Sequence, residues 1–162
     1  MLSKRMEEAL NKQINAELYS AYLYLSMAAY FDSINLNGFS HWMKIQAKEE
    51  TEHAYKLYGY VYERGGVVKL EAIDKPPTEW NSPLSVFEDS FKHEQKVSEM
   101  INNLIAMARE EKDFATENFL QWFVEEQVEE EANAGGVVQN LKMIGDSKHG
   151  LFMMDAKLGQ RQ

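Results

Sequence analysis

The chain has 162 residues, which is enough for one domain with a substantial core. Its formal net charge of −9 disfavours nucleic acid as a partner and suits the attraction of cations. The absence of cysteine excludes disulfides and thiolate metal sites and is consistent with a reducing compartment. We therefore expect a single cytoplasmic domain over residues 1–162, without a signal peptide or a membrane partner.

Helical periodicity dominates the chain, and strand signals are nearly absent. The first helix is expected over about residues 3–33, with an inward stripe of Leu10, Ile14, Glu17, Ala21, Leu25 and Ala28. Residues 18–31 are apolar nearly all round, but too short and too rich in Tyr and Ser to cross a bilayer. We therefore expect a second face of this helix to contact another subunit, through Tyr22, Met27 and Tyr30.

The second helix is expected over about residues 39–65, ending at Gly65 and Gly66. A long irregular segment follows, over about residues 66–82. Extended, it reaches about 50 Å, whereas the second helix is only about 40 Å long. The segment can therefore run the length of a bundle, so that the next helix starts at the far end.

Two further long helices are expected over about 83–111 and 113–144, and a short one over about 151–158. Ser82 and Pro83 provide a cap and a first-turn proline for the third helix. The predicted fold class is therefore all-α: a four-helix bundle with one long crossover and a short C-terminal fifth helix.

Each of the four long helices has a carboxylate at mid-length in an otherwise apolar stripe. These residues are Glu17, Glu50, Glu94 and Glu130, with His53 three residues after Glu50 and Gln127 three before Glu130. One such Glu can be a stripe-edge residue that reaches water by its stem. Four in a dry core would repel one another strongly unless cations bind them. Oxygen ligands with one imidazole suit iron, manganese or zinc.

Several ordered segments resemble the non-haem ferritins of bacteria and archaea over essentially the whole chain. They are NAELYSAYLYL (15–25), EETEHA (49–54), ERGG (63–66), EEKD (110–113), FLQWF (119–123) and EEQVEEE (125–131). The resemblance implies a ferritin-like fold and a homo-oligomeric cage, usually of 24 subunits.

The same resemblance implies a di-iron centre and a third iron site beside it. Glu17, Glu50 and His53 correspond to ligands of the first iron, and Glu50 would bridge to a second iron held by Glu94 and Glu130. Gln127 corresponds to a polar group near the second iron. Glu49, Glu126 and Glu129 correspond to a third site that shares Glu130. No haem is expected, because Thr51 stands where bacterioferritins have a haem-ligating Met.

The activity implied is that of a ferroxidase, which oxidises Fe(II) with dioxygen or hydrogen peroxide and stores ferric oxide. The overall stoichiometry would be that of four Fe(II), one dioxygen and four protons. Because the second iron lacks an imidazole, it should be held more weakly and leave more easily. Tyr24 could supply an extra electron, or could be a core tyrosine that donates a hydrogen bond to a carboxylate. Trp122 could likewise be a redox-active residue beside the site, or an ordinary core residue.

Two other classes of protein remain as alternatives at this stage. One is a small di-iron oxidoreductase or peroxidase of the rubrerythrin type, which usually has a second Glu-x-x-His or a cysteine-based iron centre. The other is a binding bundle of the helical cytokine type, which would leave the four core carboxylates unexplained. His93 is expected at the surface. Asp113 and Glu117 could line an ion channel, although an ordinary charged helix start explains Asp113 equally well.

Overall fold

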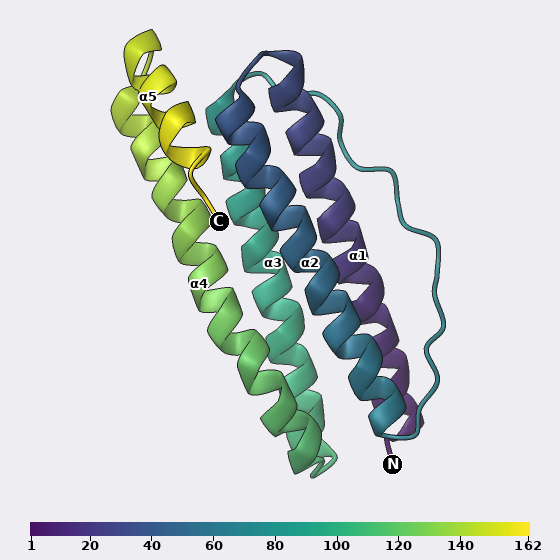
Figure 1. The fold of residues 1–162 in the computed structure, drawn as a ribbon. Coiled ribbons are helices and arrows are strands. Elements are labelled where there is room, and N and C mark those ends of the chain that lie inside the picture. Colours follow the sequence, from purple (N-terminus) through teal and green to yellow (C-terminus); the bar gives the residue numbers. More distant parts are fainter.

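A computed structural model describes all residues 1–162 as five helices without a strand. The helices are α1 (Lys4–Ser33), α2 (Asn37–Glu63), α3 (Pro83–Glu110), α4 (Phe114–Ile144) and α5 (Lys148–Leu158). Figure 1 shows the four long helices side by side, with α5 at one end of the bundle. The predicted all-α class, with a four-helix bundle, one crossover and a short fifth helix, is confirmed.

Side-chain caps fix where most of these helices begin. Ser3 accepts a hydrogen bond from the Met6 amide, and Ser82 forms a reciprocal capping box with Ser85, followed by Pro83. Ser147 caps α5, so that helix begins at Lys148, three residues before the expected start.

The N-terminus of α2 is capped by a residue from another helix. Oδ1 of Asp155 on α5 accepts hydrogen bonds from the amides of Gly38 and Phe39 at 2.8 and 3.0 Å. Gly38 is required for this approach, because a Cβ there would lie 1.7 Å from the backbone oxygen of Asp155. The same contacts therefore cap the start of α2 and hold α5 against it.

The crossover between α2 and α3 runs along the outside of α1 (Figure 1). Side chains of α1 hold its backbone: Asn11 donates to the Val67 carbonyl at 3.0 Å and accepts from the Lys69 amide at 2.7 Å. The crossover returns the chain to the opposite end of the bundle, so α2 and α3 run in the same direction, as predicted (Figure 1).

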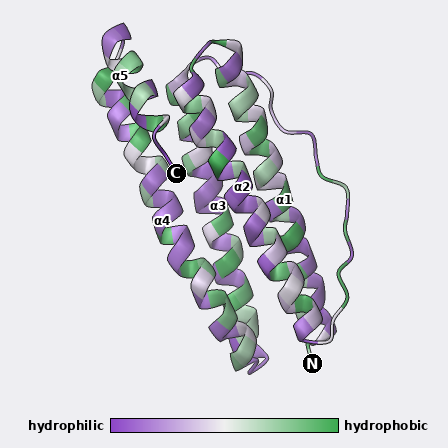
Figure 2. Ribbon diagram, viewed as in Figure 1, coloured by the Kyte–Doolittle hydropathy of each residue, from purple (hydrophilic) through white to green (hydrophobic).

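The core consists of two apolar clusters, one towards each end of the bundle. One contains Tyr24, Met27, Phe31, Phe39, Trp42 and Phe87 among others, and the other contains Met6, Leu10, Leu57, Ile101, Leu120 and Phe123 among others. Hydrophilic and hydrophobic residues alternate along every helix in Figure 2. No helix combines the length and the apolar composition that a membrane crossing requires.

The inward stripe of α1 differs in part from its prediction. Leu25 is half-exposed, whereas Tyr24 and Met27 are fully buried, so placing Leu25 inward and Met27 at a subunit contact was wrong. The reason is that the stripe continues from Glu17 by whole helical turns to Tyr24 and Phe31. Tyr30 packs against Trp80 of the crossover, with ring centroids 5.7 Å apart, and thus has a partner within its own chain.

Candidate metal centre

Six side chains with metal-binding groups lie buried at mid-length in the bundle. α1 contributes Glu17, α2 contributes Glu50 and His53, α3 contributes Glu94, and α4 contributes Gln127 and Glu130. Their relative exposures are only 1–5%. Burial of four carboxyl groups at this level requires either protonation or a bound cation.

Glu17, Glu50 and His53 form a compact group. Each offers one ligand atom, and these atoms all lie within 4.8 Å of one another. His53 Nδ1 is 3.4 Å from Glu50 Oε2. Gln13 donates to Oε1 of Glu17 at 2.8 Å, but the buried Oε2 of Glu17 accepts no hydrogen bond. A buried acceptor left without a partner, beside a second carboxylate and an imidazole, is what a cation-binding site requires.

The opposite half of the site is held by amide and phenol donors. Tyr24 donates its hydroxyl proton to Oε1 of Glu94, and Gln127 Nε2 donates to Oε2 of Glu94 at 3.1 Å. Gln46 Nε2 donates to Glu130 Oε2 at 2.6 Å and, more weakly, to Glu50 Oε1 at 3.3 Å. These donors orient the carboxylates while leaving acceptor capacity on them.

Sequence reasoning missed Gln13 and Gln46. Both stand four residues before a buried Glu on the same helix face, at Glu17 and Glu50. A polar amide at this spacing on an apolar stripe was a usable signal, because residues i and i+4 are neighbours on a helix.

When no cation is bound, burial and mutual repulsion favour the protonated form of the carboxyl groups in the site. Burial, followed by repulsion from Glu50, raises the pKa of Glu17 well above its usual range. Burial and the charge of Glu94 raise the pKa of Glu50 in the same way. Burial and the same Glu94 charge raise the pKa of Glu130 to about 7. A cation that enters must displace these protons, so its binding strengthens as pH rises.

A second group of possible ligands adjoins the first through the same imidazole. His53, Glu126 and Glu130 each offer an atom within 4.8 Å of the others, and His53 Nε2 is 3.9 Å from Glu126 Oε2. Of the other residues predicted for a third iron, Glu129 is exposed and belongs to neither group, and Glu49 is paired with Arg161 at 2.5 Å. Arg161 carried no local signal, because it lies 112 residues from Glu49 in the chain.

The aromatic residues around the site also have defined positions. Tyr24 is fully buried, and burial, with the adjacent Glu94 charge, raises the pKa of its phenol. Trp122 packs edge-on against His53, with ring centroids 5.3 Å apart. The expected surface position of His93 was wrong: it is half-buried, with Nε2 2.7 Å from Ser20 Oγ. Burial lowers its pKa to about 4.

Asp113, one of the two residues considered for an ion channel, caps α4. Its side chain accepts from the Thr116 amide, and it pairs with Arg64 at 3.0 Å. These contacts support the interpretation of Asp113 as a charged residue at the start of a helix. Glu117 pairs with Arg109 at 2.7 Å.

Together, the four-helix bundle and its buried central carboxylates resemble the arrangement found in di-metal carboxylate proteins. The model of the Ferritin-like domain family matches residues 7–144, and the chain belongs to this family. A bacterial non-haem ferritin of Bacteroides fragilis is 49% identical over 99% of this chain and 100% of its own length. One from Staphylococcus aureus is 42% identical over 99% and 97%. The crystal structure of an open pore ferritin from the hyperthermophilic archaeon Archaeoglobus fulgidus matches with a TM-score of 0.99. Its sequence is 57% identical, and the match covers both chains completely.

Proposed function

We propose that this chain is an iron-storage subunit that oxidises Fe(II) at its buried carboxylate centre and passes ferric iron to a mineral. The observation that carries the proposal is the group of Glu17, Glu50 and His53, whose ligand atoms lie within 4.8 Å of one another and in which no neighbouring donor provides a hydrogen bond to the buried Oε2 of a charged Glu17. Membership of the ferritin family and the resemblance to non-haem ferritins support the same function.

Fe(II) is the substrate, and two ions bind side by side. Glu17, Glu50 and His53 hold the first ion. Glu94 and Glu130 hold the second, and Glu50 bridges the two. Gln127 lies beside the second ion, since its amide already contacts Glu94. Because carboxylates are hard anions, they stabilise Fe(III) more than Fe(II) and so favour oxidation at the site.

Electrons and protons balance over two turnovers. Four Fe(II) ions each lose one electron, and one dioxygen takes up four electrons and four protons to give two waters. Hydrogen peroxide can replace dioxygen by accepting two electrons and two protons. The protons that Glu17, Glu50 and Glu130 hold in the cation-free site, owing to their raised pKa values, leave when iron binds.

The two iron positions have unequal ligand sets, and this difference favours the release of iron from the second position. The second ion has no imidazole ligand, so it is held more weakly than the first. The group of His53, Glu126 and Glu130 lies next to it, and Glu126 is only half-buried. We assign Glu49, Glu126 and Glu129 to a third iron position on the way out of the bundle.

Membership of the family supports a proposal for the assembly and its setting. We propose a cage of 24 copies in the cytoplasm, with the mineral inside, and no haem. Thr51, which follows Glu50, offers a hydroxyl that bonds to the Ala47 carbonyl of its own helix rather than a haem ligand. The rubrerythrin-type alternative is not favoured, because the comparisons with ferritins cover the whole chain.

Size exclusion combined with anaerobic Fe(II) addition, followed by air, tests the function. A storage protein elutes at several hundred kilodaltons and turns amber while it stays soluble. A particle of dimer size with active di-iron chemistry would instead establish redox catalysis without storage.

A variant tests the site itself. Glu50→Ala combined with His53→Ala should leave assembly intact, because charge repulsion is relieved, but should abolish rapid oxidation. Glu63→Ala, an exposed change on the same helix, is the control and should oxidise Fe(II) normally. Undiminished oxidation in the double variant would overturn the assignment.

A further inference from the structure

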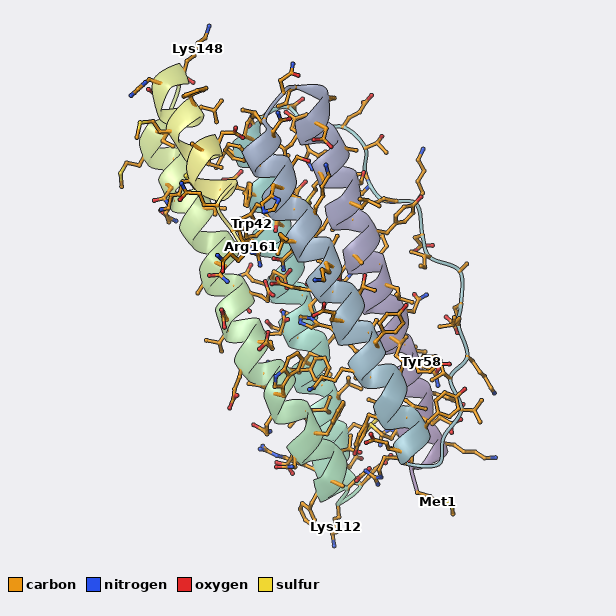
Figure 3. The ribbon with its side chains drawn as sticks, viewed as in Figure 1. Met1, Trp42, Tyr58, Lys112, Lys148 and Arg161 are labelled. Carbon is orange, nitrogen blue, oxygen red and sulfur yellow. The ribbon has the colours of Figure 1, made fainter.

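The C-terminal tail lies along one face of α2 and ends beside the metal centre. Figure 3 shows Arg161 next to Trp42 at the middle of the bundle. α5 is seated on the start of α2 through Asp155, and Gly159 passes so close that a Cβ there would lie 3.3 Å from the Gly38 Cα. The tail is therefore fixed by packing contacts that do not involve Arg161.

Arg161 is held from several sides. Its guanidinium lies over the Trp42 ring, 4.4 Å from the centroid, and Nη1 donates to the Trp42 carbonyl at 3.3 Å. Its own carbonyl accepts a hydrogen bond from His41 Nε2 at 2.7 Å. The side chain is only 17% exposed.

The guanidinium makes two hydrogen bonds to residues next to the metal centre. Nη2 donates to Oε2 of Glu49 at 2.5 Å, and Nη1 donates to Oε1 of Gln46 at 2.8 Å. Because the Gln46 oxygen is engaged by Arg161, its amide nitrogen must point inward, where it donates to Glu130 and Glu50. Arg161 thus orients an amide that contacts two proposed iron ligands.

The bond to Glu49 places the positive charge of Arg161 beside a carboxylate that is assigned above to the third iron. Burial raises the pKa of Glu49, and the charge of Arg161 opposes that rise. An arginine is always protonated, so it cannot yield by losing its charge and can only move away.

We propose that Arg161 competes with the third metal ion for the Glu49 carboxylate. The ion can then bind Glu49 fully only when the tail releases it. This inference rests on the proposed function, since it assumes that Glu49 ligates the third ion. The consequence is that the third position stays weak and transient, which favours onward transfer of iron over its retention.

Zn(II) is a suitable probe because it takes carboxylate and imidazole ligands but undergoes no oxidation. Calorimetric titration of the assembled protein should resolve three zinc ions per subunit. Removal of a half-buried ion pair of this kind should tighten the third ion about fivefold in Arg161→Gln. Arg161→Lys should remain within about twofold of the natural chain, because it keeps the charge. Arg5→Gln, which breaks an exposed ion pair with Glu110, is the matched control and should change nothing.

A double-variant cycle distinguishes competition from a merely structural role. In Glu49→Gln the third ion should weaken, and adding Arg161→Gln in that background should no longer tighten it. An unchanged third ion in Arg161→Gln, or equal tightening with and without Glu49, would overturn the proposal. Failure of the proposed function would look different: the first two zinc ions would not bind, or would survive Glu50→Ala with His53→Ala.

A second measurement uses the natural chain and does not depend on a variant that folds. Hydrogen exchange, followed by mass spectrometry, should accelerate over residues 159–162 when the third equivalent of Zn(II) is added. The amides of Gln160 and Arg161 donate to the carbonyls of Lys157 and Leu158 at 3.2 and 3.3 Å, and this last turn should fray once the contacts of Arg161 with α2 are lost. Unchanged exchange at full zinc occupancy would contradict the competition.

Discussion

Neutralising Glu130 should stabilise the metal-free protein, although Glu130 is a proposed iron ligand. Glu130 is 5% exposed, and burial together with the Glu94 charge raises its pKa from 4.5 to about 7. Glu130→Gln keeps the shape and the hydrogen bond from Gln46, but removes the charge.

The magnitude follows from proton linkage. Between pH 4.5 and about 7 the folded state binds more protons at Glu130 than the unfolded state does. Stability therefore falls as pH rises through this window, and the loss is complete above it. The rise of the Glu130 pKa from 4.5 to about 7, at about 1.4 kcal/mol per pH unit, amounts to roughly 3 kcal/mol at pH 8 and less than about 1 kcal/mol at pH 5.

Calorimetry of metal-free protein at the two pH values measures the effect. For a chain of this size the variant should melt about 6–10 °C higher than the natural protein at pH 8, and nearly level with it at pH 5. Excess Zn(II) should reverse the order at pH 8, because the natural chain then gains a ligand that the variant lacks.

Glu129→Gln is the matched control, since Glu129 adjoins Glu130 in sequence but is exposed. It should leave the melting temperature unchanged at both pH values. Equal melting of Glu130→Gln and the natural chain at pH 8 without metal would refute the reasoning. The same difference at pH 5 and pH 8 would refute it as well.

Four further changes test other parts of the structure. Gly38→Ala would place a Cβ 1.7 Å from a backbone oxygen of α5; it should cost about 2–3 kcal/mol, measured by thermal unfolding. Gly59→Ala, with nothing within 4 Å of the added Cβ, should instead stabilise by about 0.5–1 kcal/mol. Tyr24→Phe removes the hydroxyl donor to Glu94 and should slow Fe(II) oxidation about tenfold in stopped-flow absorbance, and an unchanged rate would show that the bond is dispensable. Deletion of residues 150–162 should leave the bundle helical but disturb the assembly, so a normal cage by size exclusion would count against any role for α5.

Helical periodicity was enough to predict the bundle and the depth of its central carboxylates. The three-residue spacing of Glu50 and His53 in an apolar stripe placed both on one buried helix face, and the structure has both buried there. The length of the segment after Glu63 was enough to predict the crossover, because reach along an extended chain depends only on residue number. Where two faces of a helix are apolar, periodicity alone is ambiguous, and α1 was therefore misjudged at Leu25 and Met27.

By itself, the sequence determined which helices form and which residue types converge at the middle of the bundle, since both follow from local spacing along a helix. Only the tertiary structure decided how that centre is supported. The Tyr24 bond to Glu94 and the Gln46 bond to Glu130 join helices whose rotation and depth depend on packing. The reach of Arg161 to Glu49 depends on α5 seating against Gly38. Contacts between residues on different helices, here 70 to 117 positions apart, leave no periodic trace in one sequence, because they are set by how whole helices pack.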